Sequence, residues 1–175
     1  MVGTNEGALG NSYSDSAVTS TFVNNQAGLG GVVGVNTEKG NVQYVDSLGV
    51  TNGGTTGSSN VGGVIGINKG NMYSGYNESI VSGSSNVGGI IGTNAGTYNE
   101  ADKKWESGTV SNVVNATSVT SDAADSKNVG GLVGTNTGSV TNGRNNGTIT
   151  GTNYVGGLVG DNANANSILT NLVND

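Results

Sequence analysis

The side chains able to carry chemistry are few in this chain. Its 175 residues include no His and no Cys, which excludes Ser-His-Asp and Cys-His catalysis and zinc sites built from imidazole or thiolate. A glycosidase or lyase would need two carboxylates in one groove, yet the acidic residues are scattered. The exception is one long segment that contains Glu100, Asp102, Glu106, Asp122 and Asp125. Acidic residues in a loop typically form a solvated face, with calcium binding as the alternative, and we expect neither an enzyme nor a cofactor.

The only Trp of the chain lies in the same segment. Trp105 follows Lys103 and Lys104, and residues 97–127 are the least repetitive part of the sequence. Insertions in repeat proteins emerge as loops and often carry recognition, and Trp is enriched in strong protein contacts. Residues 97–127 are therefore an expected inserted loop, with Lys103, Lys104 and Trp105 as candidate ligand-contact residues. The structural interpretation, which is the commoner one for a surface aromatic residue, is a loop that folds over the coil and covers an apolar patch with its Trp.

These candidates are set into a repeated sequence. Five similar hexapeptides recur: LGGVVG from Leu29, VGGVIG from Val61, VGGIIG from Val87, and VGGLVG from both Val129 and Val155. VGTN at residues 2–5 matches residues 133–136 and is a truncated sixth copy. The last Gly of successive motifs is separated by 31, 32, 26, 42 and 26 residues, so the minimal unit has 26 residues and other units carry insertions. A repeat of this period predicts an architecture built by stacking one unit.

One polar residue recurs in every copy, two positions after the last Gly. These residues are Asn5, Asn36, Asn68, Asn94, Asn136 and Asn162. Because one residue type fills all six positions, we predict a buried structural ladder in which each carboxamide donates to the next. A ligand groove lined by asparagines is the alternative. Further along each unit an apolar side chain recurs, at Leu9, Val42, Met72, Tyr98 and Val140.

The units predict strands and no helix. Each offers about three short β-prone pieces between Gly, Asn and Ser turn residues, and Gly interrupts every potential helix. Residues 1–175 are therefore expected to form a single all-β segment of a longer repeat array, a parallel β-helix (β-solenoid) of about five to six coils. In VGGLV-type strands the glycine pair is expected to bend the chain so that both flanking aliphatic residues turn inward. The alternative is an exposed apolar stripe at Val32, Val64, Ile90, Leu132 and Leu158.

The motifs resemble the GLUG repeat, named for its Gly-Leu-hydrophobic-Gly core. Residues 129–162, VGGLVGTNTGSVTNGRNNGTITGTNYVGGLVGDN, look like one full copy and the start of another. GLUG repeats occur in bacterial surface adhesins and beside the catalytic domain of secreted IgA-cleaving metallopeptidases. The resemblance implies a β-solenoid segment of an exported bacterial protein. It does not imply the peptidase, whose HExxH metal motif requires His.

Charge and the resemblance together set the expected function. A net charge of −6, with 6 Lys+Arg against 12 Asp+Glu, argues against nucleic acid as a partner. The sequence contains no run of about 20 apolar residues, so we expect no direct membrane insertion. We expect a structural stalk or adhesion segment, extracellular or at the bacterial cell surface, that presents loops to a host or bacterial surface protein or glycan. End-to-end self-association into fibres and a carbohydrate-binding or carbohydrate-processing β-helix are the alternatives. Tyr13 and Tyr76 share a repeat position, which favours packing between coils over a binding ladder.

Overall fold

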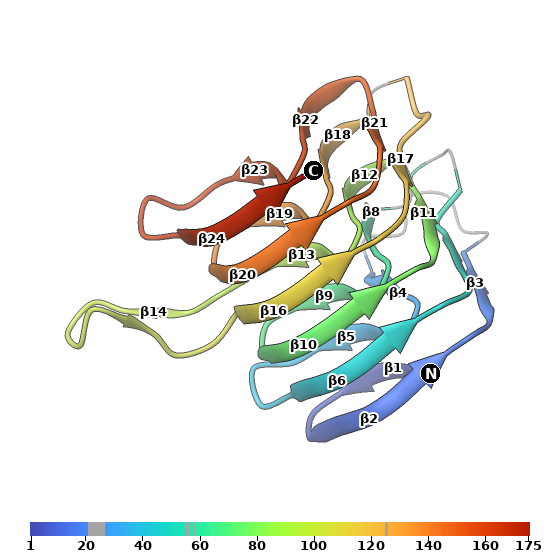
Figure 1. The fold of residues 1–175 in the computed structure, drawn as a ribbon. Helices are drawn as coiled ribbons and strands as arrows, with labels where there is room; N and C mark the ends of the chain where they lie inside the picture. Colours follow the sequence, from blue (N-terminus) through green and yellow to red (C-terminus); the bar gives the residue numbers. More distant parts are fainter. Residues whose placement is uncertain (21–26, 55–56, 58, 125) are drawn as a thin grey trace.

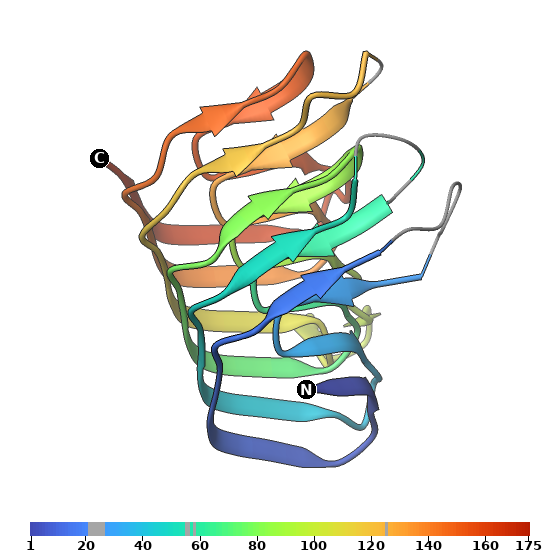
Figure 2. The ribbon, with the colours of Figure 1, turned by 90° about the vertical axis from the view of Figure 1, so that its right-hand side faces the viewer.

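The computed structural model describes residues 1–20, 27–54, 57, 59–124 and 126–175. Their regular structure is β throughout, and four parallel sheets run along the molecule in strict sequence order. We call these sheets A, B, C and D, in the order in which the chain visits them in each coil. Figures 1 and 2 show the coils stacked from the N-terminal to the C-terminal end. The predicted all-β parallel solenoid is confirmed.

Sheets A and B form the two sides of the main body, with six strands each. Sheet A contains β1 (Val2–Asn5), β5 (Val33–Asn36), β9 (Ile65–Asn68), β13 (Ile91–Asn94), β19 (Val133–Asn136) and β23 (Val159–Asn162). Sheet B contains β2 (Ala8–Ser14), β6 (Asn41–Ser47), β10 (Asn71–Asn77), β16 (Thr109–Asn115), β20 (Ser139–Asn145) and β24 (Ile168–Asn174).

Sheets C and D form a narrower wing, with five strands each. Sheet C contains β3 (Ala17–Thr19), β7 (Val50–Asn52), β11 (Ile80–Ser82), β17 (Val119–Thr120) and β21 (Ile149–Thr150). Sheet D contains β4 (Leu29–Gly30), β8 (Ser59–Gly62), β12 (Ser85–Gly88), β18 (Lys127–Gly130) and β22 (Asn153–Gly156). A separate antiparallel hairpin of β14 (Tyr98–Asn99) and β15 (Lys104–Trp105) projects from the stack (Figure 1).

The glycine pair of each motif divides what looks like one strand into two. β8 ends at Gly62 in sheet D, and β9 begins at Ile65 in sheet A. A Cβ on Gly62 would lie 2.0 Å from the Ile65 carbonyl oxygen, so the bend requires glycine. The prediction of three β-pieces per unit is therefore wrong, since the split gives four. The predicted inward turn is confirmed, because the residues after the glycine pair at Val32, Val64, Ile90 and Leu132 are fully buried.

The split produces two apolar cores that run parallel to the axis. The larger lies between sheets A and B and includes Val42, Val64 and Ile65, and the smaller lies in the C–D wing around Val61, Val81 and Val87. Neighbouring Val and Ile residues of one motif thus serve different cores. Because the chain bends at the glycines, the motif residue before the pair points into the smaller core and the two after it point into the larger core. The apolar motif residues of the inner coils are buried for this reason.

Each strand of sheet B carries one residue in the left-handed region, with φ between 50° and 57°: Asn11, Tyr44, Ser74, Asn112, Asn142 and Asn171. The register omits this residue, since Gly10 pairs with Gln43 and Ser12 with Val45. The bulge shifts the alternation of side chains, so that Val42 and Val45 both point inward although they are three residues apart. The two residues between them face outward, which gives sheet B a broad outer surface.

Candidate functional site

The first structural candidate is the asparagine ladder of sheet A. Each carboxamide Nδ2 donates to Oδ1 of the next asparagine at 2.8 to 2.9 Å, along Asn5, Asn36, Asn68, Asn94, Asn136 and Asn162. The same nitrogens also donate to carbonyls of the following turn, such as Gly70 O at 3.1 Å from Asn68. The four inner asparagines are 0% exposed, so their amides are used up within the coil stack and line no ligand groove.

A second ladder, which the sequence reasoning missed, ends the strands of sheet B. Nδ2 donates to Oδ1 at 2.8 Å at each step along Asn77, Asn115, Asn145 and Asn174. The first two coils have serine at this register, and Ser47 Oγ lies 2.7 Å from Ser79 Oγ in the next coil. Asn77 and Asn145 each lie nine residues after the first-ladder asparagine of their coil. This shared spacing is the feature of the sequence that could have predicted the second ladder.

The second ladder lies at the neck between the two cores. Cβ atoms on the second glycines of the motifs would lie 2.4 Å from Asn77 Oδ1 at Gly63, and equally close to the Cγ atoms of Asn115 at Gly89 and Asn145 at Gly131. The glycine pair therefore has two separate functions, since its first member permits the bend and its second admits the amide ladder. N-x-S/T sequons begin at Asn77 and Asn115, and both amides are buried in this ladder.

A third, partly buried ladder follows sheet D on its outer side. Asn86 Nδ2 donates to Asn60 Oδ1 at 3.0 Å, and Asn128 Nδ2 donates to Asn86 Oδ1 at 2.9 Å. The hydroxyls of Thr93 and Thr135 in sheet A donate to the same carboxamide oxygens. The bonds between asparagines run opposite to those of the first two ladders, and the threonines join sheet D to sheet A.

The predicted contact loop is a short hairpin rather than a long loop. β16 and β17 lie inside residues 97–127 and pair in register with their neighbours in sheets B and C. The predicted extent was therefore wrong. The hairpin insertion occupies residues 96–107, and a smaller lengthening separates β17 from β18. Tyr98, which the sequence comparison placed among the recurring apolar residues, lies in the hairpin instead. Val110 takes that repeat position, since it pairs with Met72 of the preceding coil.

Trp105 packs on its surroundings rather than projecting freely. Its ring lies 5.2 Å from that of Tyr98, between centroids, and a Cβ on Gly96 would meet it at 2.6 Å. Its Nε1 donates to the carbonyl of Asn166, in the turn between β23 and β24, at 3.2 Å. Asn166 Nδ2 also donates to Glu100 Oε1 at 3.0 Å. The hairpin is thus attached to the turn of a later coil.

The charged hairpin residues are largely committed to local bonds. Lys103 forms an ion pair with Glu100 at 2.7 Å, and the hydrogen bond from Lys103 is the main reason that the Glu100 pKa lies below its ordinary value. Asn99 Nδ2 donates to Asp102 and Glu106. The Lys104 side chain is exposed.

The predicted acidic group is divided by the fold. Glu100, Asp102 and Glu106 lie in or beside the hairpin, whereas Asp122 lies in the connection between β17 and β18. Asp125 lies outside the described residues. Among the residues that the structure describes, no group of three acidic side chains is arranged to hold a metal ion.

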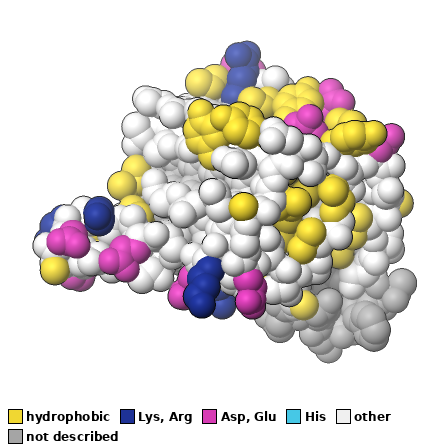
Figure 3. Space-filling view, turned by 90° about the horizontal axis from the view of Figure 1, so that it is seen from below, with side chains coloured by type: hydrophobic (Ala, Val, Ile, Leu, Met, Phe, Trp, Pro, Cys, Tyr) yellow, Lys and Arg dark blue, Asp and Glu magenta, His cyan; other side chains and the backbone are white. Residues whose placement is uncertain are grey.

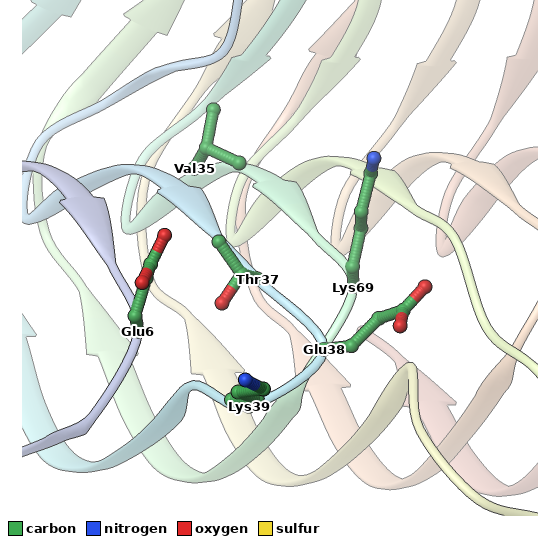
Figure 4. Close-up of a pocket in the computed structure, with 6 residues that line it drawn as sticks. All are labelled: Glu6, Val35, Thr37, Glu38, Lys39 and Lys69. Atoms are coloured by element: carbon green, nitrogen blue, oxygen red, sulfur yellow. The ribbon is translucent and has the colours of Figure 1, made fainter.

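A hollow of about 280 Å³ lies on the turns between sheets A and B. Its lining combines two acids, two lysines, a threonine and a valine: Glu6, Glu38, Lys39, Lys69, Thr37 and Val35. Figure 4 shows the charged groups spread around the hollow and pointing in different directions. The described ion pairs lie elsewhere, at Lys103–Glu100 and Arg144–Asp175. We assign no chemistry to this open hollow, because its charged groups do not converge.

Tyrosines gather on the outer face of sheet B. Tyr13 and Tyr76 align with Asp46 between them, so the two rings do not pack on each other in adjacent coils as predicted. Instead Tyr44 and Tyr73 form the aromatic contact, edge to face at 5.6 Å. Figure 3 shows hydrophobic side chains along the edge that sheet B forms, at the top of the view, with acidic and basic side chains beside them.

Comparisons with known proteins identify no relative. A scan against protein-family models, a search of curated proteins and a search of solved structures each gave no match. Within the described part of the chain, there is no helix with the length and apolar character needed to cross a membrane. The function must therefore be argued from the geometry above.

Proposed function

We propose that this chain is a rigid structural segment, a stalk, of a bacterial cell-surface or secreted adhesin-like protein of the GLUG-repeat type. The observation that supports this proposal best is the continuity of the first ladder, which links all six strands of sheet A through buried carboxamides. A stack of like units extends a surface along one axis, which suits a spacer. The six strands of sheets A and B give a rise of about 24 Å at the usual strand spacing.

Stiffness follows from where the polar bonds lie. The bonds of four sheets and three side-chain ladders run along the axis, so bending would stretch bonds on one side of the rod. The amides of the first two ladders are mostly buried, and no water is available to replace a bond that opens. Pulling the rod apart along its axis would break these bonds together.

The hairpin is the element that such a stalk would present to a partner. It leaves the stack between β13 and β16 (Figure 1), with the exposed Lys103 in its turn and the exposed Lys104 at the start of β15. Trp105 and its bond to Asn166 hold the base of the hairpin in place. A positioned loop on a rigid rod is a common way to build a recognition site. The expected partner is a surface protein or a glycan of a host or neighbouring cell.

Deleting the hairpin tests both parts of the proposal. Removing residues 96–107 leaves Asn94-Ala95-Gly108-Thr109, which matches Asn136-Thr137-Gly138-Ser139 of the next coil. We expect the deletion variant to keep its far-ultraviolet circular dichroism and its resistance to axial force in single-molecule pulling, and to lose binding in a screen of matrix proteins and of neutral and acidic glycans. Deleting residues 99–126 instead removes β16 and β17 and should unfold the rod. Easy extension of the intact chain at low force would contradict the stalk.

Fibre formation is a second candidate, favoured by the exposed edges of the stack. Large apolar side chains at the C-terminal end are 40% to 68% exposed, at Tyr154, Val155, Ile168, Leu169 and Val173. Unpaired strand edges beside apolar groups favour association. Sedimentation velocity over a range of concentrations tests this. We expect Leu169→Lys to abolish any concentration-dependent species, whereas a single sedimenting species for the unmodified chain would rule fibres out.

A further inference from the structure

Four of the six tyrosines of the chain lie on the outer face of sheet B, within its first three coils. Tyr13, Tyr44 and Tyr73 are 66%, 52% and 44% exposed, and Tyr76 is partly buried beside them. We call this area the tyrosine face. The later coils carry no aromatic side chain at the matching registers, where Ser111, Val114 and Arg144 stand instead. The aromatic groups are therefore concentrated on one half of the sheet.

Three of the four rings of the tyrosine face contact a neighbouring side chain, and Tyr13 is the most exposed of the four. Tyr44 occupies the left-handed bulge position, and its ring meets that of Tyr73 edge to face. Tyr76 Oη donates to Glu78 Oε1 at 2.9 Å. Tyr13 and Tyr76 lie in one column, two strand spacings apart, which is about 10 Å. The contacts of Tyr44, Tyr73 and Tyr76 reduce the side-chain entropy that these three rings lose when a ligand binds across them.

The charges within the tyrosine face are acidic. Asp46 lies between Tyr13 and Tyr76, and exposed Asp15 and Glu78 directly follow the ends of β2 and β10. None of the described cations belongs to these three strands of sheet B, and Lys39 and Lys69 lie in the turns before β6 and β10, at the opposite ends of the strands. The nearest sheet-B cation in the same column is Arg144, two coils beyond Tyr76, and it is paired with Asp175. Carboxylates and the faces of tyrosine rings both attract cations. Charge complementarity therefore favours a positively charged ligand.

We propose that the tyrosine face binds a linear polysaccharide of protonated amino sugars, of the β-linked glucosamine type. Its pyranose rings stack on Tyr13 and Tyr76, with their ammonium groups toward Asp46 and Glu78. Binding at the tyrosine face requires neither the hairpin nor a stiff rod. The binding proposal and the proposed stalk function can therefore fail independently of each other.

A saccharide suits this surface better than a basic peptide does. The backbone groups of β6 and β10 are paired on both sides, so a peptide lying across the rings of these strands finds no strand edge to extend, and the one free edge near this face is that of β2. A Lys-rich peptide would have to bind through flexible side chains alone, at a large cost in entropy. A stiff sugar chain is already extended, and it presents ring faces and charges at regular intervals along the column.

Binding is tested by isothermal titration calorimetry with a glucosamine hexamer at a pH where its amines are protonated. The acetylated hexamer, a neutral glucose hexamer and a Lys/Arg hexapeptide serve as comparison ligands. The double variant Tyr13→Ser/Tyr76→Ser removes both stacking rings, and Asp46→Asn removes the central charge. Tyr154→Ser is the matched control, because Tyr154 is 68% exposed but belongs to sheet D.

We expect the glucosamine hexamer to bind more tightly than its acetylated form and than the peptide. The double variant should weaken binding about tenfold and Asp46→Asn about threefold, while Tyr154→Ser changes nothing. Circular dichroism of each variant checks that it is folded. No binding of the glucosamine hexamer, equal loss in Tyr154→Ser, or tighter binding of the peptide would each overturn the proposal.

Discussion

Replacing Asn68 by Ala probes the first ladder at its most buried point. The change removes three hydrogen bonds: the donation to Asn94 Oδ1 at 2.8 Å, the donation to Gly70 O at 3.1 Å, and the acceptance from Asn36 Nδ2 at 2.8 Å. Asn36 Nδ2 keeps its bonds to two backbone carbonyls, at 3.2 and 3.3 Å. The Asn94 carboxamide oxygen loses its ladder donor in a site that is 0% exposed.

The magnitude follows from these losses. Three net bonds at about 1 kcal/mol each, and one unsatisfied buried acceptor at about 1 to 2 kcal/mol, give a loss of about 4 to 5 kcal/mol. That is a large fraction of the usual stability of a domain, about 5 to 15 kcal/mol. The matched control in the same coil is Asn71→Ala. The Asn71 side chain is exposed and accepts one bond, from Thr109, so we expect less than about 1 kcal/mol.

Urea unfolding followed by far-ultraviolet circular dichroism measures both variants. Asn68→Ala should lower the midpoint strongly, and Asn71→Ala should leave it nearly unchanged, with the same slope for both. Asn162→Ala adds a test of position, since Asn162 is exposed at the end of the ladder and accepts a single bond from Asn136. If Asn68→Ala costs no more than Asn71→Ala, the ladder does not stabilise the stack.

Two further predictions concern the neck and the tyrosine face. Gly63→Ala should destabilise by about 3 kcal/mol, because its Cβ would clash with the backbone carbonyl oxygen of Gly89 in the next coil and with Asn77 Oδ1. Gly3→Ala, with nothing within 4 Å of its Cβ, should change the unfolding midpoint little, and equal midpoints for the two variants would contradict the packing at the neck. Glu78→Gln should lower the pKa of Tyr76, which is raised chiefly by the hydrogen bond to Glu78. In the unmodified chain Tyr76 then keeps its proton to a higher pH than an ordinary tyrosine, and phenolate absorbance during a pH titration shows whether the substitution removes this delay.

The sequence repeat was sufficient to predict the asparagine ladder of sheet A, but it did not reveal the second ladder in sheet B. Every first-ladder asparagine follows its Gly at the same distance, because that stretch of chain is a single strand without insertions. The second ladder begins as serine in two coils, and the hairpin separates Asn94 from Asn115 by 21 residues instead of nine. Sequence counting cannot show where an insertion ends, since β16 resumes the register only through pairing with β10.

The contacts of Trp105 could not be predicted from the sequence either. Trp105 rests against Gly96 and reaches Asn166, 61 residues later, which lies nearby only because the coils stack. The tyrosine face was partly visible as the shared repeat position of Tyr13 and Tyr76. Tyr44 and Tyr73 occupy other registers, and the bulge at Tyr44 brings them onto the same face.

Pulsed electron paramagnetic resonance between spin labels tests the in-register stacking most directly. Thr19, Asn52, Ser82, Thr120 and Thr150 share one column of sheet C. Labels at positions 19 and 150 should be about 19 Å apart, four strand spacings, and moving the first label to position 52 should shorten the distance by about 5 Å. Distances that do not change in this step, or that exceed about 30 Å, would contradict a solenoid of coils stacked in register.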